Sequence, residues 1–177
     1  MKKEKFISLV HNRIAELAVG SSALRNQGAR QVVSKSRIFL KSLRLSKFAT
    51  SREITFQKQL DFSTQALLRR LPRRARNWGT ARKALNLFLR DVLYNSYLCE
   101  HYRFKKVEKN LEIPLDRYTM GGIRKDARDN SLLRPTTIIG LTPAVSKRYQ
   151  CAAKKIAEQK GISRVQLDLI YWRSKDL

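Results

Sequence analysis

The sequence predicts an all-α fold, in the form of a compact single-domain helical bundle over residues 1–177. Only seven glycines and four prolines occur in the chain, so few positions force a helix to stop. Apolar residues recur mostly at spacings of three and four, which is the period of an amphipathic helix. The 42% hydrophobic content can fill a core at this length, and no linker or repeat divides the chain.

Three helices are predicted in the first half of the chain, over residues 3–19, 29–43 and 56–71. Gly20 ends the first helix and Pro72 stops the third, because proline lacks the backbone N–H that a helix needs. Ser46 is expected to cap a short turn between the second and third helices. The apolar stripes of the first two helices are expected to contain Phe6, Ile7, Val10, Ile14, Leu17, Ala18, Val32, Val33, Ile38, Phe39 and Leu40.

The longest helix is predicted to begin at Gly79 or Thr80 and to end near Tyr102. A short helix over residues 106–111 follows it. Asp116 then opens a helix towards residue 127, because Asp is a favoured N-cap residue. The core-facing residues of the longest helix are expected to be Ala81, Leu85, Phe88, Leu89, Val92, Leu93, Tyr97 and Leu98.

Local signals also define the C-terminal part. A loop is predicted over residues 129–140, with a brief extended piece at 136–139. Thr142-Pro143 is an N-cap followed by a first-turn proline, and it starts a helix that Gly161 ends. Ser163 with Gln166 is a capping-box pattern for a last helix that ends near residue 172.

The net charge predicts a polyanionic partner. Lys and Arg total 38 against 14 acidic residues, which gives +24, far above the roughly 2–8 charges that a small domain needs for solubility. DNA, most simply double-stranded, is the first candidate because phosphate neutralisation releases counterions. RNA is an alternative, and an anionic membrane surface ranks below both.

The positive charge is concentrated in two acid-free stretches, between Glu16 and Glu53 and between Asp61 and Asp91. The guanidinium group of arginine matches the geometry of phosphate. For Trp78, a stacking platform for a base and an aromatic at the edge of the core are equally weighted. The expected DNA-binding residues are Arg25, Arg69, Arg70, Arg73, Arg74, Arg76, Asn77, Trp78, Arg82 and Lys83.

The two cysteines, Cys99 and Cys151, are too few for a disulfide framework, and no Cys/His spacing fits a metal. We expect them to be reduced thiols in the core of a cytoplasmic protein, associated with the nucleoid in a bacterium, with no metal and no cofactor. No apolar run approaches the roughly 18 residues of a membrane span. Polar residues interrupt the apolar N-terminal segment, so no signal peptide is expected.

Three motifs occur in a fixed order along the chain: Leu71-Pro72, then Thr80-Ala81, then Ile113-Pro114-Leu115-Asp116. In this order they resemble the helix-hairpin-helix DNA glycosylases, in which a Leu-Pro leads into a hairpin and a later turn presents an Asp at a helix start. The resemblance covers residues 71–124, and residues 165–172 look like the terminal helix of some members.

The chain departs from that family at two places. Residues 73–77 are Arg-Arg-Ala-Arg-Asn where the family's hairpin usually carries Gly-x-Gly. Trp78-Gly79 stands where bifunctional members carry a lysine before the Thr-Ala pair, and the nearest lysine is Lys83. Lys83 precedes Asp116 by 33 residues, which is longer than the family norm and weighs against strand cleavage by a lysine.

The resemblance implies hydrolysis of an N-glycosidic bond, with Asp116 as the catalytic carboxylate. Such a carboxylate stabilises the positive charge that builds on the sugar and can orient a water molecule. The target base must first leave the stack and enter a pocket. Asp116 can equally be a plain N-cap, and one residue can do both. A damaged purine, a mismatched pyrimidine and an enlarged modified base of foreign DNA all fit as substrates.

Lys83 and Asp168 are secondary catalytic candidates. Asp168 lies between Leu167 and Leu169, and we expect it to be a buried partner of an arginine rather than a catalyst. Aromatic and polar residues near the end of the longest helix could line a base pocket or belong to the core: Tyr94, Asn95, Tyr97, His101 and Tyr102.

Two other functions remain open for this sequence. One is a non-enzymatic DNA- or RNA-binding protein, such as an accessory factor of a mobile element or a defence locus, and the other is an RNA-associated structural protein. A nuclease is disfavoured, because the only acidic pair worth noting is Asp126 with Asp129 and no paired-carboxylate metal motif occurs.

Overall fold

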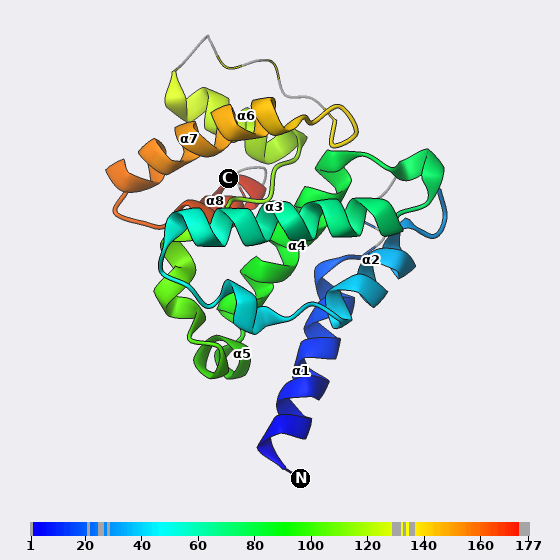
Figure 1. Ribbon diagram of the computed structural model, residues 1–177. Helices are drawn as coiled ribbons and strands as arrows, with labels where there is room; N and C mark the ends of the chain where they lie inside the picture. The colour runs from blue at the N-terminus through cyan, green and yellow to red at the C-terminus, as the bar shows by residue number, and fades with distance from the viewer. Residues whose placement is uncertain are drawn as a thin grey trace.

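A computed structural model describes residues 2–20, 22–24, 27, 29–128, 132, 134 and 137–173. The predicted all-α fold is confirmed, because every regular element in these ranges is helical. The elements are α1 (Lys3–Ala18), α2 (Val32–Lys41), η1 (Leu45–Phe48), α3 (Glu53–Arg70), η2 (Arg73–Ala75), α4 (Trp78–Tyr94), α5 (Ser96–His101), η3 (Phe104–Asn110), α6 (Arg117–Ala127), α7 (Pro143–Gln159), η4 (Arg164–Gln166) and α8 (Leu167–Arg173), where η marks a short 3₁₀ helix (Figure 1).

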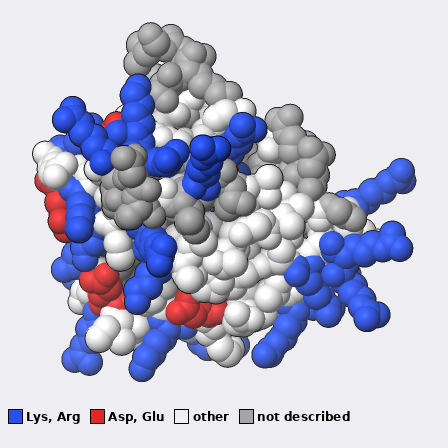
Figure 2. Space-filling view, turned by 90° about the horizontal axis from the view of Figure 1, so that it is seen from above, with Lys and Arg blue, Asp and Glu red and all other residues white. Residues whose placement is uncertain are grey.

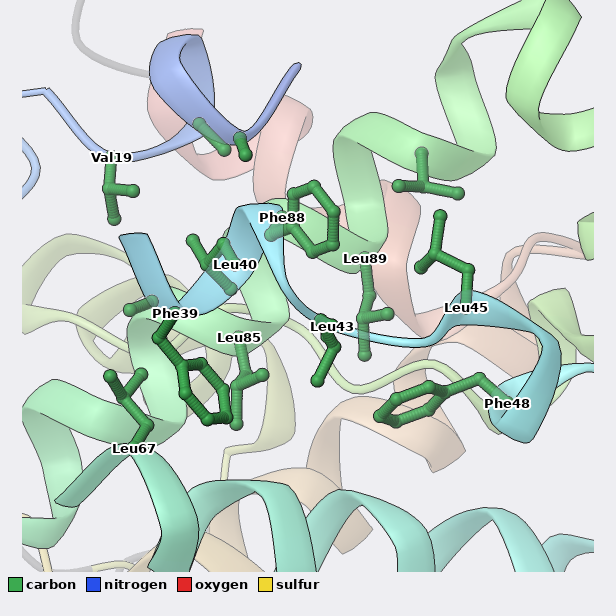
Figure 3. Packing of buried hydrophobic residues seen from close by; sticks show 14 of the residues in the cluster. Val19, Phe39, Leu40, Leu43, Leu45, Phe48, Leu67, Leu85, Phe88 and Leu89 are labelled. Carbon is green, nitrogen blue, oxygen red and sulfur yellow. The ribbon is translucent and has the colours of Figure 1, made fainter. Parts of the chain in front are cut away.

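Two hydrophobic clusters make up the core. The first joins α1, α2, α3, α4, α5 and η3, and Figure 3 shows Phe39, Leu40, Leu85 and Phe88 meeting inside it. The second joins α6, α7 and α8 with the chain that precedes α6. In Figure 1, α6 and α7 lie on one side of α3, and α1 and α5 lie on the other side. Every residue of α4 from Gly79 to Leu89 is buried.

The predicted end signals of the C-terminal helices are confirmed. Gly161 has a φ of +66°, the left-handed conformation that favours glycine after a helix. Its N–H and that of Ile162 donate to the carbonyls of Glu158 and Ala157, at 3.2 and 3.0 Å. Ser163 and Gln166 form the predicted capping box. These local contacts reverse the chain so that α8 can return to α6.

Close packing explains Gly79, which directly precedes Thr80-Ala81, where bifunctional members of the resembled family carry a lysine. A Cβ atom at this position would lie 2.0 Å from the carbonyl oxygen of Ile138. The start of α4 therefore packs directly on the turn before α7. Residues 138–140 form that turn, in which the Gly140 N–H donates to the Thr137 carbonyl at 3.1 Å, so the predicted extended piece is wrong there. Thr136 and residues 129–131 lie outside the described residues.

The prediction of one helix from residue 79 to residue 102 is wrong. The backbone of Asn95 is extended, with φ −86° and ψ 115°, and its side chain accepts from the Leu98 N–H at 3.1 Å. Asn95 therefore ends α4 and caps α5. The break makes α3, with 18 residues, longer than α4 with 17. It also leaves Tyr97 56% exposed rather than facing the core.

Three further burial predictions are wrong. Leu17 and Ile38 are exposed, and Cys151 is exposed rather than part of the core. In α1 the buried positions include His11, whose Nε2 lies 2.8 Å from the Leu40 carbonyl oxygen. The face of α1 that carries His11 therefore lies against α2, and Leu17 is on the exposed face. None of the helices described is long and apolar enough to cross a membrane.

Candidate active site and nucleic-acid interface

Lys83 and Asp116 form an ion pair between the two halves of the core. Lys83 Nζ lies 3.1 Å from Asp116 Oδ2. Lys83 comes from the buried stretch of α4, whereas Asp116 starts α6, which belongs to the second cluster. The Lys83 side chain is 8% exposed and that of Asp116 is 28% exposed. The carboxylate can therefore reach a ligand from solvent while its lysine partner stays covered.

Asp116 is held by the N-terminus of its own helix. Its Oδ1 accepts from the backbone N–H groups of Tyr118 and Thr119, at 2.9 and 3.0 Å. The Thr119 hydroxyl completes the capping box at 2.8 Å from the Asp116 backbone nitrogen. The predicted N-cap is confirmed. One carboxylate oxygen thus serves the cap, and the other faces Lys83.

The surroundings keep Asp116 ionised. Burial raises the pKa of this carboxyl, but Lys83 and the N–H groups of Thr119 and Tyr118 outweigh burial, so the pKa lies below its usual range. Opposite charge and hydrogen bonds to the charged form both act in this direction. At neutral pH the site presents a fixed negative charge.

A buried polar network holds the chain that leads to Asp116. The guanidinium of Arg82 binds both carboxylate oxygens of Glu112, at 2.9 and 3.0 Å. It also contacts Asp61 at 2.9 Å and the Thr64 hydroxyl at 2.9 Å. Asn86 donates to Glu112 at 3.0 Å. Since Arg82 precedes Lys83 and Glu112 lies four residues before Asp116, this network fixes the two members of the ion pair relative to each other.

The turn at Ile113 and Pro114 is fixed by α7 and η4. The Gln150 side chain accepts from the Ile113 N–H at 3.1 Å and donates to its carbonyl at 2.8 Å. Arg164 donates to the carbonyls of Leu111 and Asn110, at 3.1 and 3.2 Å. These polar contacts hold the chain segment that precedes Asp116. They could not be predicted from the local sequence.

Asp168 is a buried partner of Arg90, in agreement with the prediction for this residue. Arg90 also binds the adjacent Asp91, with Nε 2.8 Å from Oδ1. Burial raises the pKa of Asp168, and the charge of Arg90 only partly opposes this effect. The charges of Asp116 and Lys83 have smaller effects on the pKa of Asp168. Its tie to Arg90 is structural.

The arginines at the end of α3 and in the connection to α4 are on the surface. We call residues 69–76 the arginine loop, and its five arginines are all exposed: Arg69, Arg70, Arg73, Arg74 and Arg76. Figure 2 shows basic side chains gathered at the edge where Figure 1 has the connection from α3 to α4. Arg76 donates to the Leu71 carbonyl at 3.0 Å and Arg70 lies over the Phe39 ring.

Most of the other residues that were expected to bind DNA have side chains that contact other parts of the protein. Arg82 is 3% exposed and ion-paired, so its assignment to DNA binding is wrong, and Lys83 is buried against Asp116. Asn77 caps α4 by accepting from the Thr80 N–H at 2.8 Å. Trp78 is half-buried against the second cluster, with the Arg82 guanidinium 5.1 Å from its ring, which favours the edge of the core. Arg25 lies outside the described residues.

The expected base-pocket residues do not surround the ion pair. Tyr94 lies 11 residues after Lys83 on α4, or about 16 Å along the helix axis. Tyr97 packs edge-on against Phe6 of α1, with ring centroids 5.0 Å apart. His101 is exposed and contacts Tyr102, and Asn95 is a cap. The structure groups these side chains at the α4–α5 junction instead.

Within the described ranges, no cluster of three His, Cys, Asp or Glu residues could hold a metal ion. Asp126 accepts from the Tyr171 hydroxyl at 3.1 Å and lies 3.5 Å from Lys160 Nζ. Asp129, which the sequence places nearby, lies outside the described residues.

No family model, curated protein or solved structure matches this chain.

Proposed function

We propose that this protein is a monofunctional DNA glycosylase that hydrolyses the N-glycosidic bond of a base turned out of the duplex. The observation that carries the proposal is the state of Asp116. It is an ionised and partly exposed carboxylate, immobilised by its own helix N-terminus and by Lys83.

This carboxylate matches the charge that base removal creates. The C1′–N bond breaks, its electrons leave with the base, and positive charge builds on the deoxyribose. The base takes up a proton, and a water oxygen bonds to C1′ and gives up a proton. Asp116 stabilises the developing positive charge and orients that water. Its preorganisation matters because a fixed carboxylate needs no rearrangement when the charge appears.

Lys83 supports this reaction without taking part covalently. Its Nζ is held in the ion pair with Asp116, and a lysine nitrogen engaged in this way is not available as the nucleophile that attack on a sugar carbon requires. The product is therefore an abasic site in an intact strand. Although 33 residues separate Lys83 from Asp116 in the sequence, the two side chains are direct partners.

The arginine loop binds the phosphates of the DNA and so positions the duplex at the site. Its exposed guanidinium groups lie on the connection that leads into α4, the helix that carries Lys83. Phosphate contacts of this kind position a duplex without reading its sequence. They would serve a non-enzymatic DNA- or RNA-binding protein equally well, and that is the second candidate function.

A base-release screen separates the two candidates. The protein is incubated with DNA that carries damaged purines, mismatched pyrimidines or enlarged modified bases, and abasic sites are detected with an aldehyde-reactive probe. A glycosylase produces abasic sites in at least one of these DNAs. Binding without any base release would support the non-enzymatic candidate.

A further inference from the structure

We propose that a basic groove between α6 and α7 holds the sugar–phosphate backbone of one strand of the same DNA duplex, at a second contact away from the arginine loop. The inference rests on the proposed function, because it assigns more of the duplex that Asp116 would act on. The groove is about 1100 Å³ in volume. Its cationic lining consists of Arg128, Lys147, Arg148 and Lys155.

These four cations are uncompensated. None of them makes an ion pair or a hydrogen bond with any residue that the structure describes, whereas Lys154 and Lys160 beside them are paired with Glu53 and Asp126. Asp126 is the acidic residue in the lining. Its carboxylate is already used by the Tyr171 hydroxyl and Lys160. The groove therefore carries a local excess of positive charge that a polyanion would neutralise.

The helical period places this charge on one face of α7. Lys147, Arg148 and Lys155 line the groove, whereas Tyr149 and Ala153 face the second core. Arg148 and Lys155 are seven residues apart, which is about 10 Å along the axis. Successive phosphates of one strand advance by about 3.4 Å along a duplex, so this stripe spans about three of them.

The shape of the groove fits a strand better than a small anion. Its apolar lining includes Leu132, Ala152 and Ile156, against which the nonpolar face of a sugar can pack. A single phosphate would leave most of the volume empty. A flat membrane surface would not enter a groove, and it would leave the apolar lining uncovered.

The distance from Asp116 sets where this contact falls on the DNA. Asp116 begins α6 and Arg128 follows its last residue, a separation of 12 residues or about 18 Å. At about 3.4 Å per base pair, the Arg128 end of the groove meets the duplex about five base pairs from the target base. The arginine loop is at the other end of the site, before α4.

The test removes the charge while keeping side-chain size. The groove variant is Lys147→Gln/Arg148→Gln/Lys155→Gln. The control variant is Lys2→Gln/Lys3→Gln/Lys5→Gln, which removes the same charge from the exposed start of α1, on the far side of the molecule from α7 (Figure 1). Binding to an unmodified mixed-sequence duplex of about 30 base pairs is measured at several salt concentrations, with circular dichroism as the folding check.

We expect the groove variant to bind more weakly and its salt slope to fall by about three, one for each lost phosphate contact. The control variant should keep the slope of the unmodified protein. An equal affinity and slope for the two variants overturns the proposal. Since plain duplex releases no base, this result is independent of the base-release screen. A protein that shows the groove effect but no base release retains the DNA contact and loses the glycosylase assignment.

Discussion

Lys83 Nζ lies 3.1 Å from Asp116 Oδ2 although 33 residues separate the two side chains. The pair joins α4 of the first core to the start of α6 in the second. Any change at one member alters the charge of the site and also the contact between the two halves of the fold. Both consequences can be measured.

Replacement of Lys83 should shift the pH dependence of base release. Lys83 lowers the pKa of Asp116, so Lys83→Met should raise that pKa while keeping the length of the side chain. The carboxylate would then be protonated at a higher pH, and the acidic limb of single-turnover base release should move upwards in pH. Rates at alkaline pH should change less. An unchanged acidic limb would mean that Lys83 does not act on the carboxylate.

The ion pair should also contribute a pH-dependent part of the stability. Because the folded-state pKa of Asp116 is depressed, this contribution is present above the unfolded pKa of the carboxyl and is lost as pH falls through the folded value. Urea unfolding of the unmodified protein and of Lys83→Met should differ most near neutral pH and converge in acid. A difference that grew as pH fell would contradict this assignment.

The DNA strand should remain intact after base release. Because Lys83 is held in the ion pair with Asp116, it should not attack the sugar, and borohydride should trap no covalent protein–DNA complex. Denaturing gels should show strand breaks only after heat or alkali. A trapped complex that disappears in Lys83→Met would make the lysine a nucleophile and the protein a bifunctional enzyme.

The arginine loop should supply non-specific DNA affinity. Replacing Arg73, Arg74 and Arg76 together with Ala should weaken binding to many sequences and lower the salt slope by about two to three. The fold should survive because these side chains are exposed, although Arg76 loses its bond to the Leu71 carbonyl. The Lys2→Gln/Lys3→Gln/Lys5→Gln variant is the matched control. Equal salt slopes for the two variants would move the main DNA surface elsewhere.

The Arg82–Glu112 network should be essential for stability rather than for DNA binding. Glu112→Gln removes the buried carboxylate partner of Arg82 and leaves only the exposed Asp61 paired with it, and breaking a buried pair costs about 3–5 kcal/mol. Burial raises the pKa of Glu112, but Arg82 outweighs burial and lowers it, so the loss should be largest above the carboxyl's unfolded pKa. Urea unfolding measures it. The double variant Arg82→Met/Glu112→Leu should recover part of the loss, and a stable Glu112→Gln protein would contradict this account.

Local signals in the sequence were sufficient to predict three helix starts in the C-terminal part. The caps at Asp116, Thr142 and Ser163 each use a partner within three residues, so the sequence alone contains the whole interaction. The break at Asn95 was not predicted, because an Asn within a helical pattern of apolar residues does not by itself indicate that its side chain caps a new helix.

The polar contacts between helices could not be predicted in the same way. Arg82 stands in a run of arginines, and only the face of α4 on which it falls decides that it is buried with Glu112. For Asp168 the apolar neighbours indicated a buried partner, but not that the partner is Arg90. The pairing of Lys83 with Asp116 depends on how the two halves of the core pack together, which periodicity does not encode.

The most direct test of the proposed function compares base release by the unmodified protein and by Asp116→Asn on the DNA that the screen identifies. Asn can still cap α6, but it carries no charge to stabilise the sugar. It also leaves Lys83 unpaired, so the stability should fall by about 1–3 kcal/mol. We predict abasic sites with the unmodified protein, at least about 100-fold slower release by Asp116→Asn, and DNA binding by the variant that is equal or slightly tighter. Full base release by a folded Asp116→Asn protein would contradict the role of Asp116.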